Sequence, residues 1–97
     1  MSTPEGKVKA KVKELLKQYD CYWHMPVQNG MGAPSLDFIC CGKGKYFAIE
    51  TKAGNKQPTP RQEQTIASIQ RAGGKCFVVN EMSGMDRLEI WLKEIMR

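Results

Sequence analysis

The sequence has no long apolar run and no apolar leader. Of its 97 residues, 41% are hydrophobic and 26% are charged, and no apolar segment approaches the roughly 20 residues that a membrane-spanning helix needs. Residues 1–7 are polar, which differs from the pattern of a secretory signal. No repeat, low-complexity tract or linker divides the chain. We therefore expect one domain over residues 1–97, in the cytoplasm and without a membrane partner.

Acidic residues are scarce relative to basic ones. Ten Asp and Glu accompany fifteen Lys and Arg, which gives a formal net charge of +5. A basic surface attracts polyanions, because a protein that neutralises phosphates releases their counterions. The charge favours nucleic acid as a partner, but a basic protein without such a partner would have the same composition. Charge alone therefore does not identify the chemistry.

The four cysteines do not have the spacing of a closed zinc site. Without an export signal, reduced thiols are expected rather than disulfides. Cys21 and His24 have a ligand-like spacing, and Cys40 or Cys41 would have to complete the site, but adjacent strand residues point to opposite faces. Cysteines in apolar runs behave as small core residues. A zinc-stabilised interaction domain that uses Cys21, His24 and Cys40 is kept as a hypothesis, the third beside the two given at the end of this section.

Apolar spacing and turn residues predict seven secondary-structure elements. Thr3 and Thr59 each precede a proline at a helix start, Gln62 completes a capping box, and Ser83 is predicted to cap a third helix. The expected elements are a helix over 4–19, strands over 21–27, 36–41 and 45–52, a helix over 60–72, a strand over 75–80 and a final helix, with a tight reversal at 42–44. This order predicts an α/β fold with helices flanking a mixed four-stranded sheet.

The first and last helices carry their apolar residues at helical spacing. One face of each helix should therefore pack against the sheet. The stripe of the first helix is Val8, Val12, Leu15, Leu16 and Tyr19, and that of the last helix is Leu88, Trp91, Leu92 and Ile95.

Two carboxylates and a lysine are predicted to meet on one face of the hairpin. Glu50 and Lys52 are two residues apart on a strand, so their side chains point the same way, roughly 6–7 Å apart. Asp37 begins the partner strand, where pairing can place it across from Glu50. Carboxylate oxygens bind Mg²⁺, and a lysine beside the ion can orient water or stabilise charge that develops on a phosphate. A solvent-facing ion pair at a strand end would show the same spacing.

Three further features bear on this site. Glu5 lies on the core-facing stripe of the first helix, where it either complements the helix dipole or stands beside a metal. Gln62 is expected either to complete the capping box or to contact substrate or water, and the two roles should coexist only if the side chain moves. The glycine-containing loop 30–34 leads into Asp37, and it either admits a phosphate backbone or is a simple connection.

With these motifs the sequence resembles the PD-(D/E)XK nuclease superfamily and, within it, the virus-type replication and repair nuclease (VRR-NUC) family. The matching segments follow the family's order along nearly the whole chain: PE at 4–5, GAPSLDF at 32–38, FAIETKAG at 47–54, TPRQ at 59–62 and AGG at 72–74, before FVV at 77–79. No single motif is specific, but five in register are. One departure is Leu36, which replaces the proline usual before the aspartate and so affects strand shape but not the reacting groups.

The resemblance implies a restriction-endonuclease-like core and a divalent-metal-dependent nuclease. The catalytic residues would be those that match the family's pattern: Asp37, Glu50, Lys52, Glu5 and Gln62. The metal ligands would be Asp37, Glu50, Glu5 and the backbone carbonyl of Thr51. The cofactor would be Mg²⁺, with Mn²⁺ as a substitute and no small-molecule cofactor. Glu14 is a rival to Glu5 but lies off the helix stripe.

The predicted function is hydrolysis of DNA phosphodiester bonds by a Mg²⁺-dependent endonuclease. Short stand-alone members of the family are similar to phage proteins, so the resemblance implies branched DNA such as four-way (Holliday) junctions, a homodimer, and a bacterial or phage-infected cell. The residues expected to contact DNA without reading bases are Lys7, Lys11, Lys43, Lys45, Lys56 and Arg61. The alternative is a non-catalytic basic nucleic-acid-binding module.

Overall fold

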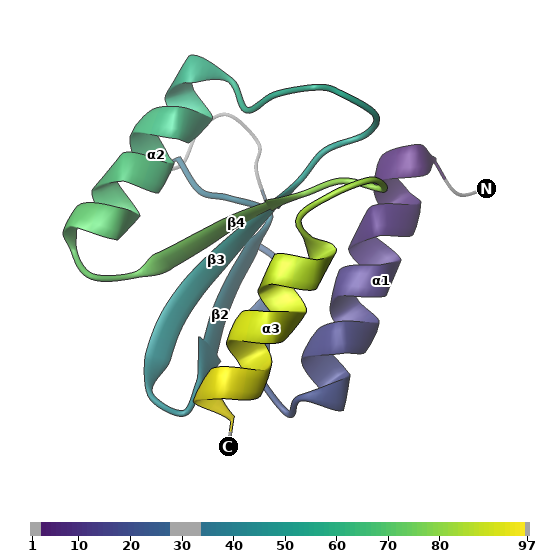
Figure 1. Cartoon of the computed structure of the whole chain (residues 1–97). Helices are drawn as coiled ribbons and strands as arrows, with labels where there is room; N and C mark the ends of the chain where they lie inside the picture. Colours follow the sequence, from purple (N-terminus) through teal and green to yellow (C-terminus); the bar gives the residue numbers. More distant parts are fainter. Residues whose placement is uncertain (1–2, 28–33, 97) are drawn as a thin grey trace.

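The computed structural model describes residues 3–27 and 34–96, and positions 30–33 of the predicted loop before Asp37 lie outside this part. The described elements follow the predicted order (Figure 1). Their bounds are α1 (Pro4–Gln18), β1 (Tyr22–His24), β2 (Phe38–Gly42), β3 (Lys45–Thr51), α2 (Pro60–Arg71), β4 (Lys75–Val79) and α3 (Met85–Ile95). The prediction of an α/β fold with a mixed four-stranded sheet is confirmed.

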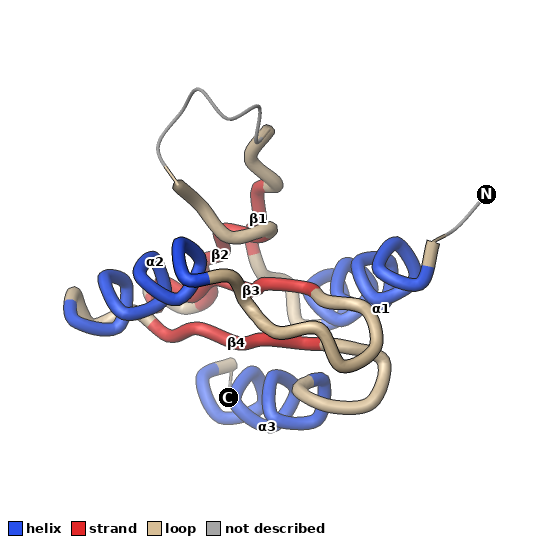
Figure 2. The backbone as a smooth tube through the Cα atoms, turned by 90° about the horizontal axis from the view of Figure 1, so that it is seen from above, coloured by secondary structure: helices blue, strands red, loops and turns tan. Residues whose placement is uncertain are grey.

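The strands form one sheet in the order β1-β2-β3-β4. β1 and β2 are antiparallel, as are β2 and β3, whereas β3 and β4 are parallel. A parallel pair needs a crossover connection, and α2 supplies it. Figure 2 shows the resulting layers, with α2 on one face of the sheet and α1 and α3 on the other.

The main core lies between the sheet and the layer of α1 and α3. Phe47 and Ile49 of β3 are fully buried there, because alternate strand residues point to one face. Trp91 of α3 packs on this face, with ring centroids 5.0 Å from Phe47 and 5.5 Å from Phe77. The predicted helix stripes are buried or pack against this core: Val8, Val12, Leu15, Leu16, Tyr19, Leu88, Trp91, Leu92 and Ile95.

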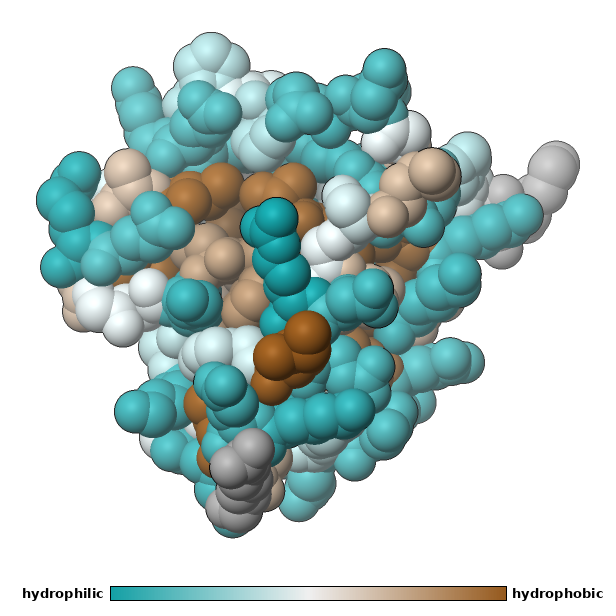
Figure 3. Space-filling view, viewed as in Figure 1, coloured by the Kyte–Doolittle hydropathy of each residue, from teal (hydrophilic) through white to brown (hydrophobic). Residues whose placement is uncertain are grey.

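The opposite face of the sheet is covered less completely. No residue of α2 is buried, although Ala48 and Glu50, which point to this face from β3, are. Figure 3 shows apolar surface gathered between α2 and α3 and framed by hydrophilic side chains. The side of the sheet that carries Glu50 is therefore the more open side.

The hairpin between β2 and β3 turns on two residues with positive φ. Lys43 has φ 51° and Gly44 has φ 78°, and Gly42 pairs with Lys45 across the turn. Positive φ at both central positions is the pattern of a type I′ turn, whose twist matches that of the flanking strands. The predicted reversal at 42–44 is confirmed, except that Gly42 belongs to β2.

The start of α3 differs from the prediction. Gly84, with φ 93°, is the N-cap and makes no side-chain cap, so the assignment of Ser83 as cap is wrong. The reason is a turn formed by Asn80, whose Oδ1 accepts hydrogen bonds from the backbone N–H of Met82 and Ser83, both at 2.8 Å. Asparagine side chains commonly form such turns with the backbone two residues on.

β1 is also shorter than predicted. Only Tyr22, Trp23 and His24 pair with β2, whereas the apolar composition suggested a strand to residue 27.

Among the described residues, no helix combines the length and the hydropathy that a membrane span requires.

Candidate active site

Asp37 and Glu50 lie together at the end of the β2–β3 pair. The last ladder pair is Phe38 with Ile49, so the next residue on each strand stands opposite the other. The backbone N–H of Asp37 donates to Glu50 Oε1 at 3.3 Å. The two predicted carboxylates therefore share one corner of the sheet, on the face that α2 partly covers.

Thr51 holds the Asp37 carboxylate from the neighbouring position. Its backbone N–H and its hydroxyl both donate to Asp37 Oδ2, at 2.9 and 2.7 Å. The sequence predicted a role only for the Thr51 carbonyl and missed this hydroxyl contact. The available signal was a polar side chain on the core-facing side of a buried strand, where it needs a hydrogen-bond partner.

Lys52 lies beside the acidic pair, as its spacing predicted. Its Nζ is 3.5 Å from Glu50 Oε2, and its backbone N–H donates to the Val79 carbonyl of β4 at 2.9 Å. The backbone contact fixes the chain directly after β3, so the ammonium group is held near the carboxylates by a short, anchored segment.

Gln62 connects the start of α2 to Glu50. Its Nε2 donates to Glu50 Oε2 at 2.9 Å, and its Oε1 accepts from the Thr59 N–H at 2.9 Å. The capping box is complete, since the Gln62 N–H also donates to Thr59 Oγ1. The two ends of its carboxamide therefore serve the capping box and Glu50 simultaneously. The expected contact of Gln62 with substrate or water, and the movement it would require, stay predictions.

The environment of Glu50 favours its protonated form. The residue is 2% exposed. Burial and the neighbouring Asp37 charge raise the pKa of Glu50 from 4.5 to about 7, while the Lys52 ammonium and the Asp37 backbone N–H act in the opposite direction. A cation bound beside Glu50 would stabilise the ionised form that burial and the neighbouring carboxylate oppose.

The donors at this corner fit a hard cation such as Mg²⁺. Mg²⁺ is typically held by one or two carboxylates and keeps several water or phosphate ligands. Asp37 and Glu50 supply the carboxylates, and Thr51 lies next to both. Across residues 3–27 and 34–96, no three His, Cys, Asp or Glu side chains gather closely enough to hold a metal. A site here would rest on two carboxylates and not on a closed protein cage.

Glu5 is not joined to this pair. Figure 1 shows that α1 begins at the end of the molecule where β3 and β4 finish. The Glu5 carboxylate, however, is 3.4 Å from Lys9 Nζ in an i,i+4 ion pair. Its rival Glu14 is exposed on α1. The structure brings together Asp37, Glu50, Lys52 and Gln62 and leaves Glu5 with a partner on its own helix.

The six basic residues predicted to contact DNA are all exposed but do not form one row. Lys43 and Lys45 lie at the β2–β3 turn, a strand length away from Glu50, which is roughly 20 Å for the seven residues of β3. The others belong to segments at or near the acidic end: Lys7 and Lys11 on α1, Lys56 between β3 and α2, and Arg61 on α2. The residues predicted to contact DNA are therefore divided between the two ends of the sheet.

A groove of about 960 Å³ lies between α2 and the open side of β1 and β2. Leu36, which directly precedes Asp37, and Ala48, two residues before Glu50, both line it. Arg61 and His24 supply its basic and titratable groups. The groove therefore lies on the face of the sheet that α2 partly covers and includes sequence neighbours of both acids, although neither acid lines it. Its contribution from β1 was missed because the expected strand had no partner assigned.

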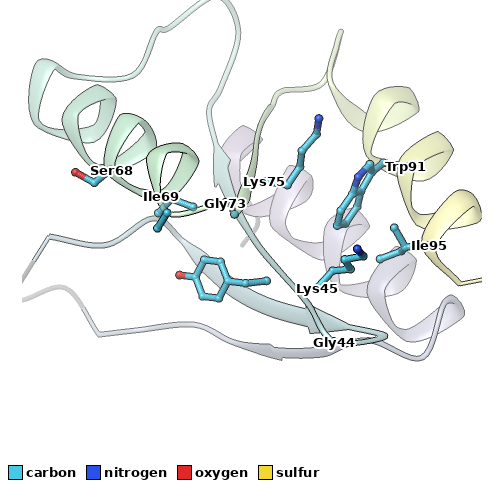
Figure 4. Close-up of a pocket in the computed structure, with 11 residues that line it drawn as sticks. Gly44, Lys45, Ser68, Ile69, Gly73, Lys75, Trp91 and Ile95 are labelled. Atoms are coloured by element: carbon cyan, nitrogen blue, oxygen red, sulfur yellow. The ribbon is translucent and has the colours of Figure 1, made fainter.

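A second hollow, of about 830 Å³, lies at the other end of the sheet. Figure 4 shows Lys45, Lys75, Trp91 and Ile95 on one side of the strands and Ser68 and Ile69 of α2 on the other. None of the predicted catalytic residues lines it. This hollow is separate from the acidic corner.

His24 is not brought together with the two cysteines proposed for a zinc site. Trp23 pairs with Cys40, so their side chains share the face of the main core, and His24, the next residue, points to the opposite face. His24 lines the groove beside α2, whereas Cys21 and Cys40 are buried in the core. The described geometry gives the third hypothesis no support.

Comparison with known structures identifies the fold. A solved structure described as a VRR_NUC domain matches this chain with a TM-score of 0.72, covering 98% of this chain and 96% of the other, at 20% sequence identity. No protein-family model matches the sequence. No curated protein matches it. At this identity the likeness establishes the fold, and the chain has the fold of a VRR_NUC domain, as its motifs predicted.

Proposed function

We propose that this chain is a divalent-metal-dependent nuclease of the VRR-NUC type, which hydrolyses phosphodiester bonds in DNA. One observation carries the proposal: Asp37 and Glu50 meet at one buried corner, with the Lys52 ammonium beside them, on the scaffold of a VRR_NUC domain. A purely structural ion pair needs one carboxylate and not two. The second acid, placed where it opposes ionisation of the first, indicates a site for a cation.

The ion would be held by Asp37, Glu50 and the backbone carbonyl of Thr51. When bound, Mg²⁺ polarises a phosphate and lowers the pKa of a bound water, and Mn²⁺ should substitute for it. The side chains of the protein position the two carboxylates. Thr51 fixes Asp37, and Gln62 fixes Glu50.

Lys52 is the group suited to assist the attacking water or to stabilise charge that develops on the phosphate. Among the described residues its ammonium makes one ion pair, with Glu50 at 3.5 Å, which uses one of its three donors and leaves the others for a phosphate or water. A strand of DNA that enters along the groove of His24 and Arg61 would bring a phosphate to this position. The water would attack in line, leaving a 3′-hydroxyl.

The substrate we propose is branched DNA, cut endonucleolytically by a homodimer. The net charge of +5 and the exposed lysines support binding to a phosphate backbone. Symmetrical cutting of a four-way junction needs two active sites, whereas one chain supplies a single acidic corner. Assays on junctions, flaps and single strands, together with the mass of the protein in solution, test these two points.

The central test is Asp37→Asn. The asparagine oxygen can still accept the two hydrogen bonds from Thr51, so folding and DNA binding should change little. Loss of the negative ligand should lower the cleavage rate by roughly 100-fold or more, because metal-assisted charge stabilisation is worth several kcal/mol. The measurement is cleavage of labelled branched, flapped and single-stranded DNA with Mg²⁺, Mn²⁺ or EDTA.

Glu14→Gln is the matched control, since it removes one acid from an exposed site on α1. It should cut at the wild-type rate. Glu5→Gln in the same series decides whether the α1 acid takes part. Normal cutting by Asp37→Asn would show that the site is wrong. DNA binding by the wild type without EDTA-sensitive cleavage would favour the alternative, a non-catalytic nucleic-acid-binding module.

A further inference from the structure

The side chain of Thr51 contacts Asp37, and the predicted role of the Thr51 carbonyl as a metal ligand does not explain this contact. Thr51 is completely buried, directly follows Glu50 along β3, and donates hydrogen bonds to the Asp37 carboxylate across the strands. Its side chain is on the face of Phe47 and Ile49, where an apolar residue would fit. A hydroxyl at such a position is costly unless it makes a hydrogen bond, and here its partner is Asp37.

The hydroxyl acts on one oxygen of the Asp37 carboxylate. Thr51 N–H and Oγ1–H converge on Oδ2, at 2.9 and 2.7 Å, and among the described residues no hydrogen bond reaches Oδ1. A carboxylate is otherwise weakly restrained about its last torsion, because the preferred angles of that torsion are broadly distributed. Two converging donors remove that freedom and leave Oδ1 as the oxygen available to a ligand.

Glu50 is held by different groups. Its Oε1 accepts from the Asp37 N–H, and its Oε2 accepts from Gln62 and lies near Lys52. None of these contacts fixes the side chain of Asp37. Thr51 is therefore the one described residue whose side chain orients this acid.

We propose that the Thr51 hydroxyl is a positioning group that sets the orientation of Asp37 for metal binding. This inference rests on the proposed function, because it assumes that Asp37 is a metal ligand. It assigns the hydroxyl a role separate from that of the Thr51 carbonyl. Its physical basis is that outer hydrogen bonds to a ligand orient it in advance and tune its affinity for the ion.

The test compares Thr51→Val with Thr51→Ser. Valine keeps the branched shape and removes the hydroxyl, whereas serine keeps the hydroxyl. Mn²⁺ binding to the DNA-free protein, measured by isothermal titration calorimetry, should weaken by roughly 10- to 100-fold in Thr51→Val and recover most of this loss in Thr51→Ser. Cleavage by Thr51→Val should need correspondingly more Mn²⁺, and excess Mn²⁺ should restore part of its rate.

Ile49→Val is the control for stability. Ile49 is buried on the same strand and face as Thr51, and its truncation destabilises the core without removing a polar group. It should lower the melting temperature while leaving Mn²⁺ affinity unchanged. If Thr51→Val binds Mn²⁺ as tightly as the wild type, the hydroxyl has only a structural role and the inference is overturned.

A second measurement does not depend on how well the valine variant folds. In a crystal structure of the wild-type protein with Mn²⁺, the Thr51 hydroxyl should remain on Oδ2 and the ion should lie on Oδ1. An ion bound through Oδ2, with the hydroxyl displaced, would overturn the inference while leaving the nuclease proposal intact. A wild-type protein that binds no divalent cation and does not cut would overturn both.

Discussion

Glu50 is the residue whose state sets the conditions under which the site can act. Its pKa is raised to about 7 by burial and by Asp37, so a neutral solution holds a mixture of protonated and ionised molecules. Only the ionised form is a good ligand for a hard cation. Metal binding should therefore release a proton near neutral pH and strengthen as the pH rises.

The same shift predicts how stability depends on pH in the metal-free protein. Between 4.5 and about 7 the folded state binds more protons at Glu50 than the unfolded state, so the contribution of this residue is fully present below pH 4.5 and is lost as the pH rises through 7. Glu50→Gln should remove this loss. We expect the variant to be more stable than the wild type by roughly 3 kcal/mol at pH 8, and by almost nothing near pH 4.5.

Urea unfolding in EDTA, at several pH values between 4.5 and 8, measures this difference. Comparison of the two proteins cancels the titration of groups that they share. Saturating Mn²⁺ should reverse the order of stability at pH 8, because the wild type gains a ligand that the glutamine lacks. A stability difference that does not change with pH would show that Glu50 titrates normally.

At the scale of the elements, the start of α3 depends on a close backbone approach. A side-chain carbon on Gly84 would overlap the Val78 carbonyl oxygen and would lie 2.9 Å from the Val79 Cα. Gly84 also has a φ of 93°, which side chains rarely adopt. The glycine therefore allows α3 to begin directly against β4.

Gly84→Ala and Gly44→Ala form a matched pair. Both glycines have positive φ, but nothing lies within 4 Å of a side-chain carbon on Gly44. Gly44→Ala should cost about 1 kcal/mol from backbone strain alone. Gly84→Ala should cost roughly 3 kcal/mol, since a clash with backbone atoms adds to the strain. The urea midpoints of the two variants measure the difference, and equal midpoints would exclude the clash as a cause.

The order of the elements was predictable because apolar periodicity and caps act locally. The start of α2 is marked by its cap Thr59, by Pro60 and by the capping-box residue Gln62, and the apolar stripes of α1 and α3 predict their buried faces. Ser83 is not the cap, because its backbone N–H donates to Asn80 Oδ1 in a competing turn. Such competition depends on the path of the chain, which local sequence does not specify.

The site was predictable in part for the same reason. Strand periodicity and hairpin pairing place Asp37, Glu50 and Lys52 together. The hydroxyl contact of Thr51 depends on atomic placement at the end of the ladder, and the ion pair of Glu5 with Lys9 on a choice between local and distant partners. Spacing alone decides neither.

At the scale of the whole molecule, the two ends of the sheet differ. The acidic pair, the starts of α1 and α2, and the ends of β3 and β4 share one end, whereas the β2–β3 turn lies at the other (Figure 1). The basic residues are divided between them. DNA engaged at the acidic end would pass Arg61 in the groove but would need to extend along a strand length to reach Lys43.

This division predicts unequal effects from two equal charge changes. If DNA binds as proposed, Arg61→Ala should weaken binding of branched DNA several-fold and lower the salt dependence of binding by about one ion, because it would remove a proposed phosphate contact in the groove. Lys43→Ala removes the same charge at the far end and should change both quantities much less. Fluorescence anisotropy with Ca²⁺ in place of Mg²⁺, over a range of salt concentrations, measures both. Equal losses would indicate a DNA path that spans the whole sheet.

The placement of the helices also governs how the protein can be attached to something else. α1 begins at the acidic end, and α3 finishes at the opposite end (Figure 1). A tag, a surface linker or a fused partner joined before Thr3 would emerge at the acidic end, where we propose that substrate binds. One joined after Met96, or inserted at the exposed Lys43–Gly44 tip, would project away from it, so immobilised or labelled forms should be built from that side.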